Sequence, residues 1–112
     1  MNIAQVRRHA MSLAEVTEEP HHHFSSFRVA GKIFVTVLPE ETYIHIFVSE
    51  EQRELALSLE PECMEKLLWG GKVVGLRVDL ANAPAAVVKR LMSQAWAHKA
   101  PKAVLTGLLR GL

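Results

Sequence analysis

The segment that decides the fold of this chain spans residues 69–80 and reads WGGKVVGLRVDL. Its paired glycines allow backbone angles that other residues avoid, which predicts a bend just after Trp69. After the glycines, apolar residues alternate with mostly polar ones, a pattern typical of a strand with one buried face. The segment therefore predicts a Trp-Gly bend between two strands, a short one over 62–68 and a longer one over 72–80.

Hydrophobic periodicity predicts the other elements on either side of this segment. Apolar residues at helical spacing indicate helices, and runs of β-branched and aromatic residues indicate strands. The expected helices cover 2–15, 50–59, 84–99 and 102–110, and the expected strands cover 24–30, 32–38 and 43–48. The resulting order is α-β-β-β-α-β-β-α-α. Trp96 falls on the apolar stripe of the 84–99 helix and is expected in the core.

Three consecutive histidines, residues 21–23, follow the acidic stretch that ends in Pro20. Proline disfavours helical geometry in the residue before it, so the first helix is expected to end there. Adjacent side chains on an extended segment point to alternate sides, which makes it difficult for three in a row to bind one metal ion. We therefore interpret the histidines as a solvated linker, and a metal site is the weaker alternative.

Length and composition indicate a single domain over residues 1–112. A hydrophobic fraction of 49% and a charged fraction of 22% are ordinary for a soluble globular protein. Cys63 is the only cysteine, which excludes an internal disulfide and fits a reducing compartment. The N-terminus does not resemble a signal peptide, and no run of about 18 apolar residues is present. These observations predict a cytoplasmic protein without a membrane span.

The net charge of +1 hides an asymmetry between the two halves of the chain. Residues 1–65 carry five Lys/Arg and eleven Asp/Glu, a net charge of −6, and residues 66–112 carry eight Lys/Arg and one Asp, a net charge of +7. A basic half points toward a polyanionic partner such as DNA. The alternative is that the two halves interleave in the fold and neutralise each other.

The candidate phosphate contacts lie on the second predicted strand of the bend and on the helices that follow. They are Lys72, Arg77, Lys89, Arg90, Lys99 and Lys102. A contiguous basic face would form if the 72–80 strand and the 84–99 helix packed side by side. Trp69 is the one aromatic residue expected near such a face, and a structural role in the core or over the glycines is favoured for it.

Enzyme signatures are absent from the sequence. It contains no nucleophile elbow, no phosphate-binding Gly-rich loop with its Lys-Ser/Thr ending, and no His-Glu-x-x-His helix. The glutamate pairs sit at expected turns and helix starts, where solvation and the helix dipole account for them. The expectation is therefore a protein that is not an enzyme, with no catalytic residue, no cofactor and no metal.

Three separate stretches carry a family resemblance. Residues 27–34 read FRVAGKIF, Trp69-Gly70 leads into the 77–80 strand, and residues 99–102 read KAPK. In this order, and over nearly the whole chain, they resemble the MmcQ/YjbR family of small bacterial proteins. The chain departs from the family pattern at Leu76 and in the 62–68 segment, where the family often has aromatic residues. A ligand that depends on those aromatic side chains would not be bound here.

The resemblance implies an α+β fold in which an antiparallel five-stranded sheet packs against helices, similar to secretion-chaperone-like folds. It also implies a non-enzymatic, DNA-binding module, the label that the family commonly carries, and regulation is one use of such a module. Two alternatives stay open. One is a chaperone-like interaction with another protein through a sheet face or the apolar side of the last helix, made of Val104, Leu105, Leu108 and Leu109. The other is small-molecule binding in a candidate pocket formed by Lys32, Phe34 and Trp69.

Overall fold

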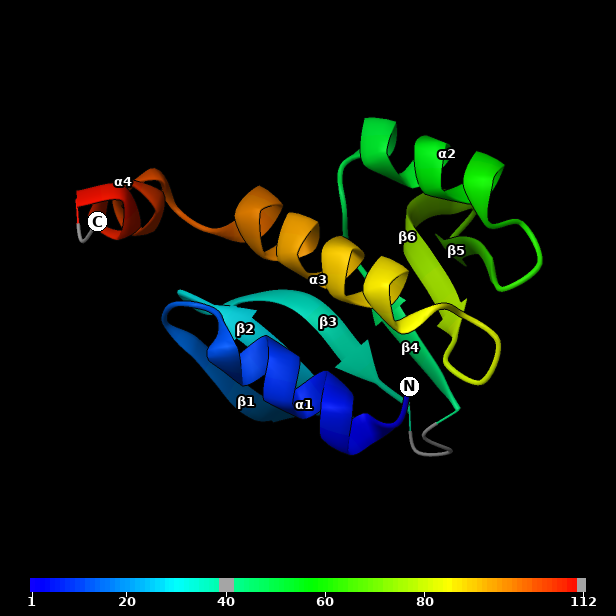
Figure 1. Cartoon of the computed structure of the whole chain (residues 1–112), viewed down its shortest axis with the longest axis horizontal. Coiled ribbons are helices and arrows are strands. Elements are labelled where there is room, and N and C mark those ends of the chain that lie inside the picture. The colour runs from blue at the N-terminus through cyan, green and yellow to red at the C-terminus, as the bar shows by residue number, and fades with distance from the viewer. Residues whose placement is uncertain (39–41, 111–112) are drawn as a thin grey trace.

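The computed structural model describes residues 1–38 and 42–110. Over these residues the chain forms four helices and six strands (Figure 1). The helices are α1 (Ile3–Ser12), α2 (Glu50–Leu59), α3 (Ala85–Lys99) and α4 (Lys102–Arg110). The strands are β1 (Val16–His21), β2 (Phe24–Val29), β3 (Lys32–Val37), β4 (Tyr43–Ile46), β5 (Met64–Trp69) and β6 (Lys72–Asp79). In this part of the chain, no helix has the length and apolar character needed to cross a membrane.

The strands form one antiparallel sheet in the order β1-β2-β3-β4-β6-β5. Helices α1 and α3 lie over the same face of this sheet, and α2 packs beside β5 and β6 (Figure 1). We call the face turned away from α1 and α3 the back face. The arrangement confirms the α+β fold with an antiparallel sheet packed against helices.

The sheet has six strands rather than the five expected, because β1 was not predicted. Helix α1 ends at Ser12, and residues 16–21 pair with β2 along their whole length, from Val16 opposite Val29 to His21 opposite Phe24. The proline and acidic residues that suggested the end of the first helix are equally suited to an edge strand, where one row of backbone groups faces solvent. The interpretation of residues 21–23 as a linker was therefore wrong, since His21 ends β1 and the next two histidines form the turn to β2.

The Trp-Gly bend is confirmed as the tight turn of the β5–β6 hairpin. Gly70 and Gly71 have φ angles of +58° and +78°, in the left-handed region that side chains disfavour. Trp69 and Lys72 are opposite each other at the end of this hairpin. Most of the 62–68 segment, which was expected to be a short strand, forms β5, which begins at Met64.

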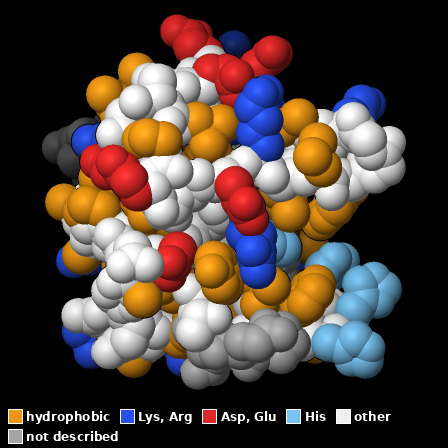
Figure 2. Space-filling model, turned by 90° about the vertical axis from the view of Figure 1, so that its right-hand side faces the viewer, with side chains coloured by type: hydrophobic (Ala, Val, Ile, Leu, Met, Phe, Trp, Pro, Cys, Tyr) orange, Lys and Arg blue, Asp and Glu red, His pale blue; other side chains and the backbone are white. Residues whose placement is uncertain are grey.

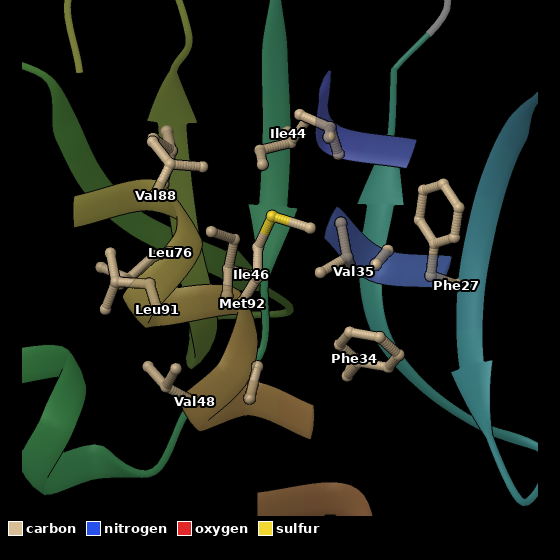
Figure 3. Close-up of a cluster of buried hydrophobic side chains, with 14 of the residues drawn as sticks. Phe27, Phe34, Val35, Ile44, Ile46, Val48, Leu76, Val88, Leu91 and Met92 are labelled. Carbon is tan, nitrogen blue, oxygen red and sulfur yellow. The ribbon is translucent and has the colours of Figure 1, made fainter. Parts of the chain in front are cut away.

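The core lies between the sheet and its covering helices (Figure 3). In Figure 3, Val88, Leu91 and Met92 of α3 point toward Ile44, Ile46 and Leu76 of the sheet. The expected core position of Trp96 is confirmed, because its side chain is 6% exposed. Its Nε1–H donates a hydrogen bond of 2.9 Å to the carbonyl oxygen of Ala14, between α1 and β1. This bond ties the last third of the chain to its beginning.

A β-bulge changes the direction of one side chain on β3. Phe27 of β2 pairs with Val35, whereas the next residue, Arg28, pairs with Ile33, so Phe34 has no direct partner. A bulge of this kind lets two successive side chains point to the same side. Phe34 and Val35 are accordingly both fully buried in the core (Figure 3).

Cys63 lies in the connection between α2 and β5 and is buried. Its Sγ approaches the carbonyl oxygen of Glu60 at 3.7 Å. Burial raises the pKa of this thiol above its ordinary value, and the carboxylates nearby act in the same direction. The thiol is therefore protonated and shielded in the folded protein.

Candidate functional site

Most of the cations proposed as phosphate contacts have no ion-pair partner in the described part of the chain. Within residues 1–38 and 42–110, five of the six have no carboxylate within 4.0 Å, namely Lys72, Lys89, Arg90, Lys99 and Lys102. The exception is Arg77, whose Nη1 lies 3.0 Å from Oε1 of Glu65. The Arg77 guanidinium also lies 3.9 Å from the centre of the Tyr43 ring. Arg77 is thus already neutralised within the protein.

The structure does not bring the six cations to one surface. Helix α3 packs chiefly against β3, and Arg77 of β6 belongs to the back face, which is turned away from α3. Along α3 itself, Arg90 and Lys99 are nine residues apart and point in roughly opposite directions. Arg90 faces α2, and Lys99 reaches a groove on the back face. The contiguous basic face that required the 72–80 strand beside the 84–99 helix is therefore not formed.

Lys89 lies near a second cation, Arg8, which was not among the candidate phosphate contacts predicted from the sequence. A hollow of about 230 Å³ between α1 and α3 is lined by Gln5, Arg8, His9, Ser12 and Lys89. We call it the α1–α3 hollow. Neither Arg8 nor Lys89 has a carboxylate partner among the described residues, and none of the lining residues is acidic. The sequence places Arg8 on the outer side of the first helix, but only the packing of α1 on α3 shows that it lies near Lys89.

The imidazole of His9 forms part of the same hollow. Its Nε2 lies 3.0 Å from the hydroxyl oxygen of Ser93, which links α1 to α3. Burial lowers the pKa of His9 and outweighs a backbone hydrogen bond with Lys89 that acts in the opposite direction, and the positive charge of Lys89 lowers the pKa further. His9 is consequently neutral near pH 7, and the positive charge of the hollow comes from its two longer side chains.

The back face carries a row of polar residues across all six strands. Each residue of this row lies opposite the next one on the neighbouring strand. From β1 to β5 the row runs Glu19, Ser26, Thr36, His45, Arg77 and Glu65. Ser26 is satisfied, because its hydroxyl donates to the carbonyl of Glu19 at 2.7 Å. In contrast, Oγ1 of Thr36 and Nδ1 of His45 are buried and have no hydrogen-bond partner among the described residues. Burial lowers the pKa of His45, as does the charge of Arg77 to a smaller extent.

A groove of about 270 Å³ opens on the back face beside this row. It is lined by His21, Ile33, Thr36, Phe47, Trp69 and Lys99. We call it the back-face groove. Trp69 is 51% exposed, so of the two structural roles expected for it, in the core or over the glycines, the core position was wrong, and its ring centre lies 5.8 Å from that of Phe47. Figure 2 shows exposed hydrophobic side chains on this side of the molecule, above a group of histidines at the lower right.

Of the three residues expected to form a small-molecule pocket, only Trp69 lines the groove. Phe34 is in the core, and Lys32 is exposed at the start of β3, next to the groove residue Ile33. Gly75 of β6 permits the close approach of Phe47, because a Cβ atom there would lie 2.8 Å from the Ile46 carbonyl oxygen and 3.1 Å from Cδ1 of Phe47. No sequence pattern indicated that Thr36 and Lys99 would meet at this site.

The described apolar residues of the last helix are less exposed than its sequence indicated. Val104 and Leu105 of α4 are half-buried and pack against the edge of the core. The side chains of the other two apolar residues, Leu108 and Leu109, lie outside the described part of the chain. Within that part, no three His, Cys, Asp or Glu side chains gather in a way that could hold a metal ion.

Most of the sequence matches the model of a known family. The family model described as YjbR matches residues 11–98. The chain belongs to the YjbR family. No curated protein matches this YjbR-family chain at a significant level.

A solved structure supports the fold of this YjbR-family chain. The crystal structure of Deinococcus radiodurans protein DR2400, which carries the DUF419 domain, superposes with a TM-score of 0.76 at 17% sequence identity. The match covers 96% of this chain and 87% of that chain. At this level of identity the likeness establishes the shared fold and leaves the functional residues to be argued from the structure itself.

Proposed function

We propose that this YjbR-family protein is a non-enzymatic module that binds duplex DNA through the phosphate backbone. The observation that carries the proposal is the α1–α3 hollow, in which Arg8 and Lys89 converge without a carboxylate partner in the described chain. Unpaired cations on one surface supply most of the affinity of non-specific DNA binding, because they release counterions condensed on the phosphates.

The surroundings of the hollow suit a phosphate group. Gln5 places an amide beside the two cations that can donate a hydrogen bond to a phosphate oxygen, whereas the Ser12 hydroxyl already donates to the carbonyl of His9. Arg90 follows Lys89 on α3 and is displaced by about 100° around the helix, so it is available to a neighbouring phosphate. Lys72 and Lys102 are exposed but do not line the hollow. No Phe, Tyr or Trp side chain lines the hollow, which favours duplex backbone over stacked single strands.

A salt titration with matched variants tests this proposal. If Arg8, Lys89 and Arg90 each engage one phosphate, log Kd for a short duplex should change with log salt with a slope of magnitude about 2.7, and each lost contact should reduce it by about 0.9. Lys89→Gln should therefore weaken binding and flatten the slope, and Arg8→Gln/Lys89→Gln should do so further. Reversal of charge in Lys89→Glu/Arg90→Glu should weaken binding most.

Lys66→Gln is the matched control, because it also removes one positive charge. Lys66 lies on the edge strand β5, and its Nζ is 3.6 Å from Oε1 of Glu54. It should leave the DNA affinity nearly unchanged. Equal weakening by Lys66→Gln and Lys89→Gln would contradict the proposed surface, and an affinity that ignores salt between about 50 and 200 mM would contradict DNA binding itself.

A further inference from the structure

We infer that the back-face groove is a binding site for a small aromatic anion, separate from the DNA surface proposed above. The first observation is a buried polar group without a partner. Thr36 is 2% exposed and lines the groove, and no described residue accepts from or donates to its hydroxyl. A buried hydroxyl without a hydrogen bond is unfavourable in a folded protein. A ligand in the groove would supply the missing partner.

The walls of the groove define the apolar part of the ligand. Trp69 and Phe47 present two aromatic rings tilted by 55° to each other, and Ile33 adds an aliphatic side chain. A half-exposed tryptophan at the edge of a cavity is a surface onto which a flat ring can pack. The volume of about 270 Å³ limits the ligand to roughly one or two fused rings with a short substituent.

The charges at the groove define the other end of the ligand. Lys99 has no carboxylate partner in the described part of the chain, and none of the lining residues is acidic. His21 adds a second nitrogen-bearing side chain. One carboxylate or phosphate group on the ligand would therefore meet the Lys99 ammonium, while its ring lies against Trp69 and its polar substituent reaches Thr36.

The two tryptophans allow a direct test by NMR. The indole N–H of Trp69 reports on the groove, and that of Trp96, which is buried and bonded to the Ala14 carbonyl, serves as an internal control. Titration of the ¹⁵N-labelled protein with indole-3-acetate should shift the Trp69 signal in a saturable way and leave the Trp96 signal in place. Indole-3-acetamide, which has the same ring without the charge, should bind about tenfold more weakly. Phenyl phosphate distinguishes a phosphate from a carboxylate preference.

Two variants separate binding from folding. Lys99→Met should weaken indole-3-acetate binding about tenfold and leave the affinity for the neutral amide unchanged. Thr36→Val keeps the shape of the side chain and removes the unpaired hydroxyl, so it should lower the ligand affinity roughly threefold to tenfold while the thermal midpoint of the free protein stays equal or rises. A variant that merely damaged the fold would lower that midpoint.

Four results would overturn the inference. The first is equal affinity for the acid and the amide in the wild-type protein. The second is an unchanged affinity for the acid in Lys99→Met. The third is the absence of a saturable Trp69 shift with either anion up to about 10 mM. A Trp69 signal that moves with protein concentration alone would show that a second copy covers the groove, which also contradicts the inference. None of these outcomes bears on the DNA titration, which depends on Arg8 and Lys89.

Discussion

At the scale of single residues, His45 stands out because it is a buried imidazole in the middle of a sheet. It is 7% exposed, and its Nδ1 has no hydrogen-bond partner among the described residues. The guanidinium of Arg77, its neighbour on β6, adds a positive charge nearby. Both features disfavour a second positive charge on the ring, so the folded protein holds His45 in its neutral form.

This environment predicts a loss of stability in mild acid. The pKa of His45 is lower in the folded protein than in the unfolded chain, so the unfolded chain binds the proton more readily. The free energy of unfolding should therefore fall as the pH drops below about 6.5 and level off below the folded-state pKa. Urea titrations between about pH 7.5 and 5.5 should show this decrease.

Substitution of His45 isolates the part of the pH dependence of stability that is due to its imidazole. His45→Gln should show a flatter dependence of the free energy of unfolding on pH, whatever its effect on stability at pH 7. The pKa of His9 is also lowered by burial. His9→Gln should therefore also make the free energy of unfolding depend less on pH. A wild-type pH dependence retained in His9→Gln/His45→Gln would show that neither imidazole causes it.

At the scale of elements, the β5–β6 hairpin is the feature that the sequence specifies most strongly. Its turn residues, Gly70 and Gly71, have positive φ angles at successive positions, the pattern of a two-residue turn that suits the twist of paired strands. A side chain with a branched Cβ is unfavourable in this conformation, whereas asparagine tolerates it.

The conformation of this turn predicts that two substitutions lower the free energy of unfolding by different amounts. Gly71→Val should lower the free energy of unfolding by about 1–2 kcal/mol or more, because valine resists the left-handed conformation. Gly70→Asn should cost much less, because Asn-Gly is a favoured pair in this type of turn. Chemical denaturation of the two variants measures the difference, and equal costs would contradict the turn assignment.

Elements whose periodicity is long and regular were predictable from sequence, and short edge elements were not. The expected helix over 84–99 and the observed α3 agree within one residue, since its buried positions recur at helical spacing. Strand β1 was missed because Pro20 and its acidic neighbours give the same signal at a helix end and at a sheet edge. The burial of Phe34 depends on a bulge, which alternation alone does not reveal.

The candidate sites were less predictable, because they depend on contacts between distant parts of the chain. Arg8 and Lys89 are 81 positions apart in the sequence, and only the packing of α1 on α3 brings them to one hollow. Lys99 and Trp69 meet only through the arrangement of α3 around the sheet. Composition indicated that the second half is basic, but the folding of the chain decides which cations face one another.

At the scale of the whole molecule, long-range bonds join the beginning of the chain to its second half. The terminal amino group of Met1 lies 3.3 Å from the carbonyl oxygen of Leu80, and the Trp96 indole donates to the carbonyl of Ala14. The core cluster likewise contains residues from α1, the sheet and α3. We therefore expect the protein to unfold as one cooperative unit.

The two tryptophans provide a matched test of this cooperativity. Trp96→Phe keeps most of the apolar volume but leaves the Ala14 carbonyl without its donor, so the free energy of unfolding should fall by about 1–3 kcal/mol. The denaturant slope should stay the same, since the amount of surface exposed on unfolding is unchanged. Trp69→Phe, on the half-exposed ring, should cost about 1 kcal/mol or less. A larger cost at Trp69 than at Trp96 would contradict the assigned burial.

Because Cys63 is buried, the rate at which its thiol is labelled measures local opening of the structure around it. The chain carries one thiol, and a labelling reagent reaches it only when the connection between α2 and β5 opens. The rate of modification, compared with that of the denatured chain, converts into the free energy of this opening when reclosing is fast. Each molecule is labelled once, so one mass measurement at each time point gives the fraction of molecules that have been labelled. The amide of Asp79 on β6 donates to the Cys63 carbonyl at 2.8 Å, so the labelling rate also reports how tightly this end of β6 is held.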